Sequence, residues 1–350
     1  MTRFTTLLAS AATALALTSA AKAADAELTI LDWSGFEIEG LFTDYVAKHG
    51  DVPTFSFFGD DDEAFQKVAS GFKPDAVHPC SQKVGKYRDA GLIEPWDESR
   101  IPALAELDPK LLDNPVFKDD QGLWFLPSYW GATAVAYNTK EVPAEDVATL
   151  QVFTDPKYAG RISIPDSSDD VWALAYLATG VTDWTNISDE QFQAAADWLR
   201  KVHPNVRAYW ADPAEQAQLM MSGEVLIALS WNDGVALLQA EDFPVGFQRE
   251  ATEGSSTFVC GWVNVKDGPG SEDKLYDFVN SWLRKDAAKA LVDGLGYGHS
   301  NAAGMAGIDQ AQLTTAGLGP INAPNLPQVP NDPALRERQL AEFELIKQGF

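Results

Sequence analysis

Aromatic and acidic side chains stand close together at several places along the chain. The segments Asp32-Trp33-Ser34-Gly35-Phe36 and Trp231-Asn232-Asp233 are examples from its two halves. An aromatic face attracts an ammonium group by roughly 0.5–2 kcal/mol, and a carboxylate adds a charge-assisted hydrogen bond that a ring cannot make. These residue types together favour the binding of a small organic cation.

The same side chains could have purely structural roles, because aspartates cap helices and tryptophans fill hydrophobic cores. The candidates are Trp33, Phe36, Trp130, Trp172, Trp210 and Trp231, with Asp32, Asp60, Asp61, Asp62, Asp166, Asp169, Asp170 and Asp233. Any one of them taken alone favours the structural interpretation. Their recurrence in both halves of the chain favours a binding site.

Motifs of common enzymes are absent from the sequence. It contains no G-x-x-x-x-G-K-[ST], no H-E-x-x-H and no C-x-x-C, and its four histidines lack the spacing of metal ligands. The segment Gly298-His299-Ser300-Asn301-Ala302 resembles a nucleophile elbow but has Ala302 where glycine is required. We therefore expect no catalysis, no cofactor and no metal ion. An exported hydrolase that uses Cys80 or Ser300 is the remaining enzymatic alternative.

Hydrophobic patterning indicates the elements that would position these residues. The first part of the chain predicts strands at 28–33, 52–58 and 75–78, and helices at 40–48, 61–70 and 83–90. Strands that alternate with helices predict an α/β fold with a mostly parallel sheet. Because ligands of such sheets bind outside the carboxyl ends of the strands, the candidate loops are 32–36, 58–62 and 78–82.

The alternation restarts after an extended apolar run at 126–138, which we interpret as a strand that crosses between two lobes. The later part predicts strands at 161–164, 225–231 and 258–265, and helices at 169–178, 188–201, 233–241, 271–284 and 333–347. The proline-rich segment 315–333 is expected to be a loop. The strand-end loops in this part are 165–170 and 231–234.

Composition and the N-terminus indicate an exported protein. A basic start, an apolar run and Ala21-Lys22-Ala23 are the three features of a signal peptide, so we expect residues 1–23 to be cleaved near Ala23. The formal net charge of −25 disfavours nucleic acid and anionic membranes as partners. The two cysteines, Cys80 and Cys260, could form one bridge in an oxidising compartment, although their spacing does not show that they meet.

Several segments resemble one known family. Asp32-Trp33-Ser34-Gly35-Phe36, Tyr129-Trp130-Gly131-Ala132-Thr133-Ala134 and Ser230-Trp231-Asn232 are similar to the opening, the lobe-crossing strand and a ligand strand of the periplasmic spermidine/putrescine-binding proteins of ABC transporters. The resemblance runs from about residue 28 to the C-terminus. It implies the type II periplasmic binding protein fold, with two α/β lobes, hinge-crossing strands and a ligand cleft that closes by a hinge motion.

The resemblance also implies an organisation and partners. Residues 24–131 with about 254–303 would form lobe 1, and residues 132–253 with about 304–350 would form lobe 2. The protein would be a periplasmic monomer that delivers a small amine-bearing solute to ABC transporter permease subunits.

The ligand-binding residues that the resemblance implies are carried over position by position. Trp33 and Trp231 match aromatics that sandwich the polyamine, Phe36 stands where a tyrosine is usual, and Asp170 matches an acid that holds a terminal amine. The other family positions hold Cys80, Gln82, Ser167, Phe258 and Cys260, and Asp32 and Trp130 lie beside the expected pocket. Cys260 replaces the aspartate that pairs with an inner amine, and Ser167 replaces a second carboxylate.

These departures bear on the ligand. An unpaired ammonium is costly to bury, so the loss of the inner carboxylate favours putrescine over spermidine. A zwitterion such as aminobutyrate, a betaine or an amino acid is the alternative, and it would require Arg207, Arg249 or Lys83 to reach the cleft. Because both cysteines map to the cleft edge of one lobe, the resemblance also suggests a Cys80–Cys260 disulfide.

Overall fold

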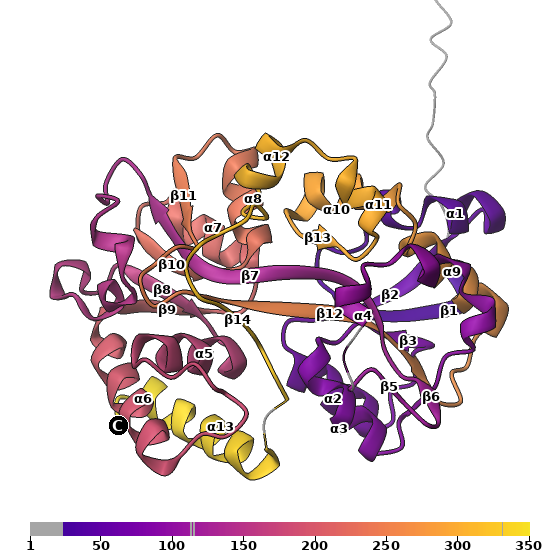
Figure 1. The fold of residues 1–350 in the computed structure, drawn as a ribbon, viewed down its shortest axis with the longest axis horizontal. Helices are drawn as coiled ribbons and strands as arrows, with labels where there is room; N and C mark the ends of the chain where they lie inside the picture. The colour runs from indigo at the N-terminus through magenta and orange to yellow at the C-terminus, as the bar shows by residue number, and fades with distance from the viewer. Residues whose placement is uncertain (1–23, 113, 115, 331) are drawn as a thin grey trace, which may run out of the picture.

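Two long strands, β7 (Leu126–Asn138) and β12 (Ser255–Val265), run across the centre of the computed structural model and join its two halves (Figure 1). They are antiparallel over Ser256–Trp262 of β12 and Leu126–Thr133 of β7. The structure describes residues 24–112, 114, 116–330 and 332–350. The expected signal peptide, residues 1–23, lies outside these residues.

The first half is built on a parallel sheet with helices around it. Its strands are β1 (Ala24–Trp33), β2 (Val52–Phe58) and β3 (Ala76–Val77), in the order β2-β1-β3, and β12 continues the sheet in the antiparallel sense. Its helices are α1 (Thr43–His49), α2 (Asp61–Ala69), α3 (Val84–Asp89), α9 (Glu272–Trp282) and α10 (Ala287–Leu295).

The second half repeats this arrangement on the other side of the crossing strands. Its parallel strands are β10 (Ile227–Ser230), β8 (Ile162–Pro165) and β9 (Val206–Trp210), while β11 (Val245–Gln248) pairs with β7 in the antiparallel sense. Its helices are α5 (Ser168–Ala178), α6 (Asp189–Val202), α7 (Pro213–Met221), α8 (Asn232–Ala240) and α13 (Pro333–Lys347).

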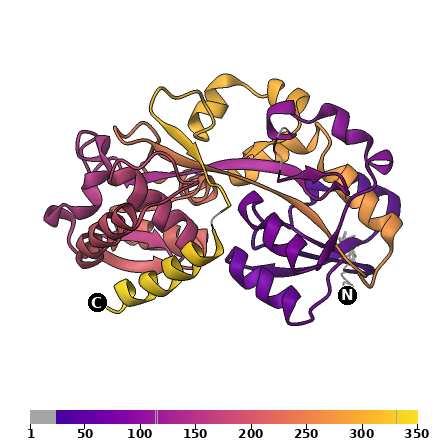
Figure 2. The same cartoon turned by 60° about the horizontal axis from the view of Figure 1, so that its bottom comes forward.

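Short elements connect these parts. They are β4 (Ile93–Glu94), α4 (Pro109–Leu112), β5 (Lys118–Asp119), β6 (Gly122–Leu123), β13 (Gly298–His299), α11 (Ala302–Ala306), α12 (Gln310–Thr315) and β14 (Asn325–Pro327). Figure 2, a view turned by 60°, also shows the two crossing strands running from one half to the other. No helix in the described part of the chain has the length and apolar character needed to cross a membrane.

Each half has its own hydrophobic core. One cluster of buried side chains draws on residues 28–129 and 258–297, and a second draws on residues 135–251 with Phe343 and Ile346 of α13. Because β7 runs from one half into the other, it contributes Leu126 and Tyr129 to the first core and Val135 to the second. This separation is what allows the two halves to be regarded as lobes.

Local sequence signals account for several element ends. Gly50 ends α1 in the left-handed conformation, with φ 84°, which costs glycine little because it lacks a Cβ. Ser188 and Gln191 form a reciprocal capping box at the start of α6. The α/β fold is confirmed, and β2, β7 and α13 have the predicted bounds.

Other sequence-based expectations need correction. The sheet is parallel within each half but antiparallel along the crossing strands, because β7 and β12 traverse the molecule in opposite directions. The strands β9 and β11 and the helices α7 and α10 were not predicted from the sequence. The segment 315–333 is not wholly a loop, since β14 pairs in parallel with the start of β12.

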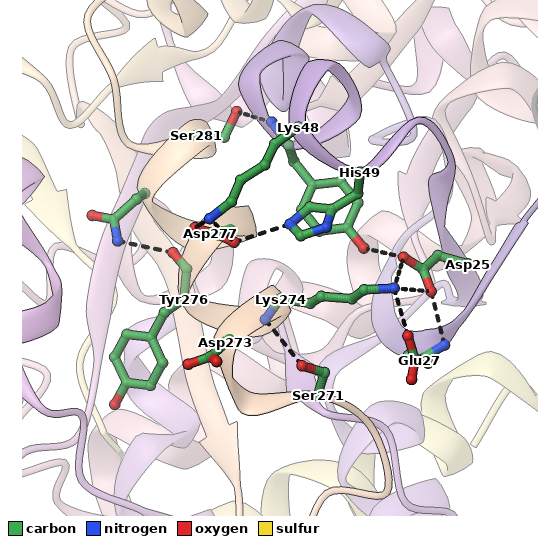
Figure 3. Close-up of polar contacts among 12 residues, drawn as sticks. Asp25, Glu27, Lys48, His49, Ser271, Asp273, Lys274, Tyr276, Asp277 and Ser281 are labelled. Carbon is green, nitrogen blue, oxygen red and sulfur yellow. Dashed lines mark hydrogen bonds and ion pairs between the residues drawn. The ribbon is translucent and has the colours of Figure 1, made fainter.

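Ion pairs attach the first described strand to α9 (Figure 3). Lys274 Nζ lies 2.6 Å from Asp25 Oδ2 and 2.9 Å from Glu27 Oε2, and Tyr45 Oη also donates to Asp25. Asp277, one turn further along α9, accepts from Lys48 and His49 of α1. These contacts hold β1 and α1 against α9, so that the end of β1 reaches the centre of the molecule in a defined position.

Candidate ligand-binding site

A cavity lies between the two halves of the molecule, at the carboxyl ends of its parallel strands. It contains about 660 Å3 of empty space, including the part that is open to solvent. Eight of the eleven expected ligand residues line it: Trp33, Phe36, Cys80, Gln82, Ser167, Asp170, Trp231 and Phe258. Both halves therefore contribute to one site.

The other three expected residues lie off the cavity. Asp32 is fully buried beneath it, where its Oδ1 lies 2.7 Å from His78 Nδ1. Cys260 is also fully buried and is joined by a disulfide to Cys80, so that Cys80 alone faces the cavity. Trp130 packs against a small apolar cluster that includes Val292. Their contacts are structural in this arrangement.

Two tryptophans, one from each half, meet across the cavity. The ring centroids of Trp33 and Trp231 are 6.1 Å apart at an interplanar angle of 75°. Trp33 Nε1 donates to the backbone oxygen of His78 at 2.8 Å, and Trp231 Nε1 donates to Asp170 Oδ2 at 3.1 Å. Because both indole N–H groups are used within the protein, the ring faces are what the tryptophans present to a ligand.

Further aromatic side chains form one end of the cavity. Tyr129 lies 4.9 Å from Phe36 and 5.0 Å from Tyr297 between ring centroids, and Phe258 lies 5.8 Å from Tyr297. All four rings line the cavity and are buried. Their faces could contact methylene groups as well as a cationic end group.

Carboxylates dominate the polar part of the lining. They belong to Asp60, Asp61, Asp169, Asp170, Asp212 and Asp233. Within the described chain, no lysine, arginine or histidine lines this cavity. The lining is therefore complementary to a positively charged ligand.

Four of these aspartates occupy the first turns of helices. Asp61 begins α2, Asp169 and Asp170 lie in the first turn of α5, and Asp233 lies in the first turn of α8. The partial positive charge of a helix N-terminus stabilises an anion at such a position. The strand that precedes each helix ends at the cavity. This explains why residues that follow the carboxyl ends of predicted strands are found in its lining.

Asp170 is the most extensively bonded carboxylate of the cavity. Its Oδ1 accepts from Thr133 Oγ1 at 2.6 Å and from Gln328 Nε2 at 2.8 Å. Its Oδ2 accepts from Trp231. Burial raises the pKa of Asp170 in spite of these bonds. The carboxylate is thus held in one orientation but lacks a cationic partner of its own.

Burial also raises the pKa values of two other cavity carboxyl groups. The pKa of Asp61 rises to about 8, although Lys83 partly opposes the effect of burial. The pKa of Asp233 rises to about 7, although a hydrogen bond from Tyr297 opposes it. Desolvation disfavours the ionised form, so a cation placed between these groups would favour their deprotonation.

Basic residues that could bind a ligand carboxylate are engaged elsewhere. Lys83 forms ion pairs with Asp62 and Asp169, each at 3.0 Å. Arg207 pairs with Glu224 at the surface, and Arg249 donates to the backbone oxygen of Gly319. None of the three lines the cavity.

The residues of the hydrolase alternative have no catalytic arrangement. Cys80 is bonded to Cys260, whereas a cysteine nucleophile must be a free thiolate. Ser300 is fully buried away from the cavity. No group of three or more histidine, cysteine, aspartate or glutamate side chains in the described residues is placed to hold a metal ion.

Among the lining residues that were not predicted from the sequence, Asp212, Tyr297 and Gln328 carry polar side chains. Asp212 follows β9 and caps α7, and the Asp212-Pro213 pair is a helix-start signal that could have revealed it. Tyr297 follows Gly296, which ends α10 in the left-handed conformation. Gln328 follows β14 and bonds both Asp170 and Gln82, so it connects the two sides of the cavity.

Comparison with known proteins places this fold and cavity in a family. The family profile of bacterial extracellular solute-binding proteins matches residues 41–315. The chain belongs to this family. It is also 26% identical over 300 residues to the spermidine/putrescine-binding periplasmic protein of Escherichia coli, with 85% of this chain and 84% of that relative covered.

Solved structures support the same fold. A Listeria monocytogenes protein assigned to spermidine/putrescine ABC transport superposes with a TM-score of 0.79 at 21% identity, over 91% of this chain and 98% of that protein. The protein MotA of Agrobacterium tumefaciens, solved in complex with glucopine, superposes with a TM-score of 0.74 at 17% identity, over 92% and 99% of the two chains. The type II periplasmic binding protein fold is confirmed, and proteins of this shape bind more than one class of ligand.

Proposed function

We propose that this solute-binding protein is the periplasmic component of an ABC transporter and that it binds a small diamine of the putrescine type between its two lobes. The observation that supports this most is the composition of the cavity lining. It has six aspartates and several aromatic rings, and none of the described residues that line it is basic. A dication would supply the missing positive charge, and the ring faces would contact its methylene groups. The name of the Escherichia coli relative supports the same class of ligand.

The residues on β12 favour putrescine over spermidine. Phe258 lines the cavity, and Cys260 is buried in the disulfide, so these positions offer no carboxylate to an inner amine. An ammonium without a partner is costly to bury. A ligand with charges only at its two ends avoids this cost.

The lobes proposed are 24–131 with about 254–303 and 132–253 with about 304–350, and they would close over the ligand about β7 and β12. In the closed form, water would be excluded and the attraction between carboxylate and ammonium would strengthen. The remaining parts of the proposal are export with cleavage near Ala23, delivery to ABC transporter permease subunits, a monomeric state and the absence of catalysis. No described cavity residue favours a zwitterion.

The test is calorimetric titration of the chain from Ala24 onward with putrescine, spermidine, agmatine, aminobutyrate and a betaine. We expect putrescine to bind more tightly than spermidine, and the two zwitterions to bind weakly or not at all. The variant Asp170→Asn should weaken putrescine binding by more than about 100-fold, because it removes one partner of a buried ion pair. Asp166→Asn is the matched control, since Asp166 pairs with Lys347 at the surface and does not line the cavity. Binding of the zwitterions alone would contradict the proposal.

A further inference from the structure

Four charged side chains form a closed ring beside the cavity, with alternating signs. Lys83 Nζ lies 3.0 Å from Asp62 Oδ2 and 3.0 Å from Asp169 Oδ2. The guanidinium of Arg336 contacts the same two carboxylates, through Nη2 to Asp62 and through Nη1 to Asp169 at 2.7 Å. Every member of the ring therefore contacts two members of opposite charge.

The ring spans the boundary between the two halves of the molecule. Asp62 lies in α2 and Lys83 in a 3-10 turn (Ser81–Lys83), both in the first half. Asp169 lies in α5 and Arg336 in α13, both in the second half. Figures 1 and 2 show α13 beneath the second half, with its first turn directed towards α2. Two of the four contacts thus cross from one half to the other.

The ring is largely shielded from water. Side-chain exposure is 6% for Lys83, 18% for Asp62, 10% for Asp169 and 12% for Arg336. Burial by itself would raise the pKa values of Asp62 and Asp169, but Lys83 and Arg336 outweigh it and hold both values below the ordinary range. Partly buried pairs of this kind are screened by salt much less than surface pairs.

We propose that Asp62, Lys83, Asp169 and Arg336 form a latch that holds the two lobes together and so sets ligand affinity through contacts between the lobes. They are positioning residues that act through closure. The part of the proposal that concerns affinity rests on the proposed function. The part that concerns closure does not, because it depends only on contacts between the two halves.

The arrangement of charges suits a latch that must reopen. Separation of the lobes would break Lys83–Asp169 and Arg336–Asp62 but would leave Lys83 with Asp62 and Arg336 with Asp169. The first half would keep Asp62 with Lys83 and with Lys86, whose Nζ lies 2.9 Å from Asp62 Oδ1, and the second half would keep Arg336 with Asp169, so none of these charges would be left without a partner. Opening therefore avoids the large cost of an unpaired charge with little solvent access.

The latch also distinguishes Asp169 from the other cavity carboxylates. Asp169 lines the cavity, but both of its oxygens are already engaged by cations, Oδ1 by Arg336 and Oδ2 by Lys83. Its neighbour Asp170 accepts only from neutral groups in the described structure. Asp170 is therefore available to an ammonium group, whereas Asp169 serves closure.

The test compares Arg336→Gln with Arg338→Gln. Arg338 lies on the same helix and pairs with Asp189 within the second half, so its variant removes an equal charge without crossing the cleft. We expect ligand-free Arg336→Gln to have a larger radius of gyration by small-angle X-ray scattering, and to bind putrescine about 10-fold more weakly, the effect of a typical coupling between sites. Arg338→Gln should change neither quantity.

A second variant, Lys83→Met, removes the other contact that crosses the cleft and should reproduce both effects. Thermal unfolding of each variant verifies that it is folded. If Arg336→Gln does not fold, the result for Lys83→Met decides the outcome. The latch would be overturned if both variants had the same radius of gyration and the same putrescine affinity as the unaltered protein. If the unaltered protein does not bind putrescine, the proposed function fails, and the scattering comparison still decides whether the latch exists.

Discussion

Three carboxyl groups of the cavity, those of Asp61, Asp170 and Asp233, are buried without a cation of their own, and burial raises the pKa of each. In the absence of ligand, the pKa values of about 8 for Asp61 and about 7 for Asp233 leave a substantial protonated fraction of these two groups near neutral pH. A bound diamine would favour the ionised forms, since each ammonium gains from a carboxylate partner. Ligand binding and proton release should therefore be linked.

We predict that putrescine affinity increases with pH between about pH 6 and about pH 8 and then levels off. Below the pKa values of about 8 for Asp61 and about 7 for Asp233, a proton must leave before the carboxylate can pair with the ligand, so binding weakens as the pH falls. Titrations at several pH values, each in two buffers of different ionisation enthalpy, measure the affinity and the protons released. In the variant Asp233→Asn, the increase of putrescine affinity with pH should be smaller. A constant affinity across this range would contradict the link.

The stability of the ligand-free protein should change in the opposite sense. A carboxyl group whose pKa is raised in the folded state binds more protons folded than unfolded, so its contribution to stability falls as the pH rises from its unfolded pKa to its folded pKa. For Asp61 this window extends to about pH 8, and for Asp233 to about pH 7. Unfolding by urea at matched pH values in the absence of ligand gives the free energy needed for the comparison.

At the scale of elements, the close approach of β7 to its neighbours depends on Gly131. A Cβ at this position would lie 2.7 Å from Phe258 Cζ and 2.7 Å from Tyr297 Cδ1, both in side chains that line the cavity. Glycine is therefore required where the crossing strand passes beneath the aromatic end of the site. This requirement is steric, because no left-handed backbone conformation is involved at Gly131.

We predict that Gly131→Ala lowers the free energy of unfolding by about 1–3 kcal/mol, the usual cost of an overpacked core. It should also weaken putrescine binding, because Phe258 and Tyr297 must move to accommodate the methyl group. Gly85→Ala is the matched control: a Cβ at Gly85 of α3 meets nothing within 4 Å, and alanine favours a helix over glycine. Urea unfolding and calorimetric titration measure both effects. Equal stability of the two variants would show that β7 can adjust to the added methyl group.

Elements with strong local signals could be predicted from the sequence. The continuous apolar run of β7 and the proline start of α13 gave the correct bounds. The missed strands β9 and β11 are short and only partly buried, so their apolar pattern is weak. Helix α10 has an aspartate, Asp286, at its N-cap position, although this side chain makes no cap hydrogen bond, so a start signal for this helix was present in the sequence.

The candidate site was predictable where its residues follow strands in sequence. Trp33, Asp170 and Trp231 come directly after β1, β8 and β10 or within a few residues of them. Gln328 could not be found in this way, because the pairing of β14 with β12, remote in the sequence, brings it to the cavity. The exclusion of Cys260 from the cavity likewise depends on its disulfide with Cys80, which is remote in the sequence.

At the scale of the whole molecule, the cavity is embedded in a strongly acidic protein. The formal net charge is −25 over 350 residues, and it would be −27 for residues 24–350, since residues 1–23 carry Arg3 and Lys22 and no acid. A field of this sign raises the local concentration of cations around the protein. The cavity itself adds six acidic side chains at the place where a diamine would bind.

We predict that the association rate constant of putrescine decreases by about 10-fold between low salt and 0.5 M sodium chloride, since salt shortens the range of the protein's field. Stopped-flow tryptophan fluorescence is suited to the measurement, because Trp33 and Trp231 line the cavity. The dissociation rate constant should change less with salt. Dissociation requires the ion pairs of the latch to separate, and salt screens these pairs weakly because they are largely buried. In Arg336→Gln, dissociation should be faster at every salt concentration while association keeps its salt dependence. A salt effect confined to dissociation would instead show that closure, and not the field of the whole molecule, controls how salt affects binding.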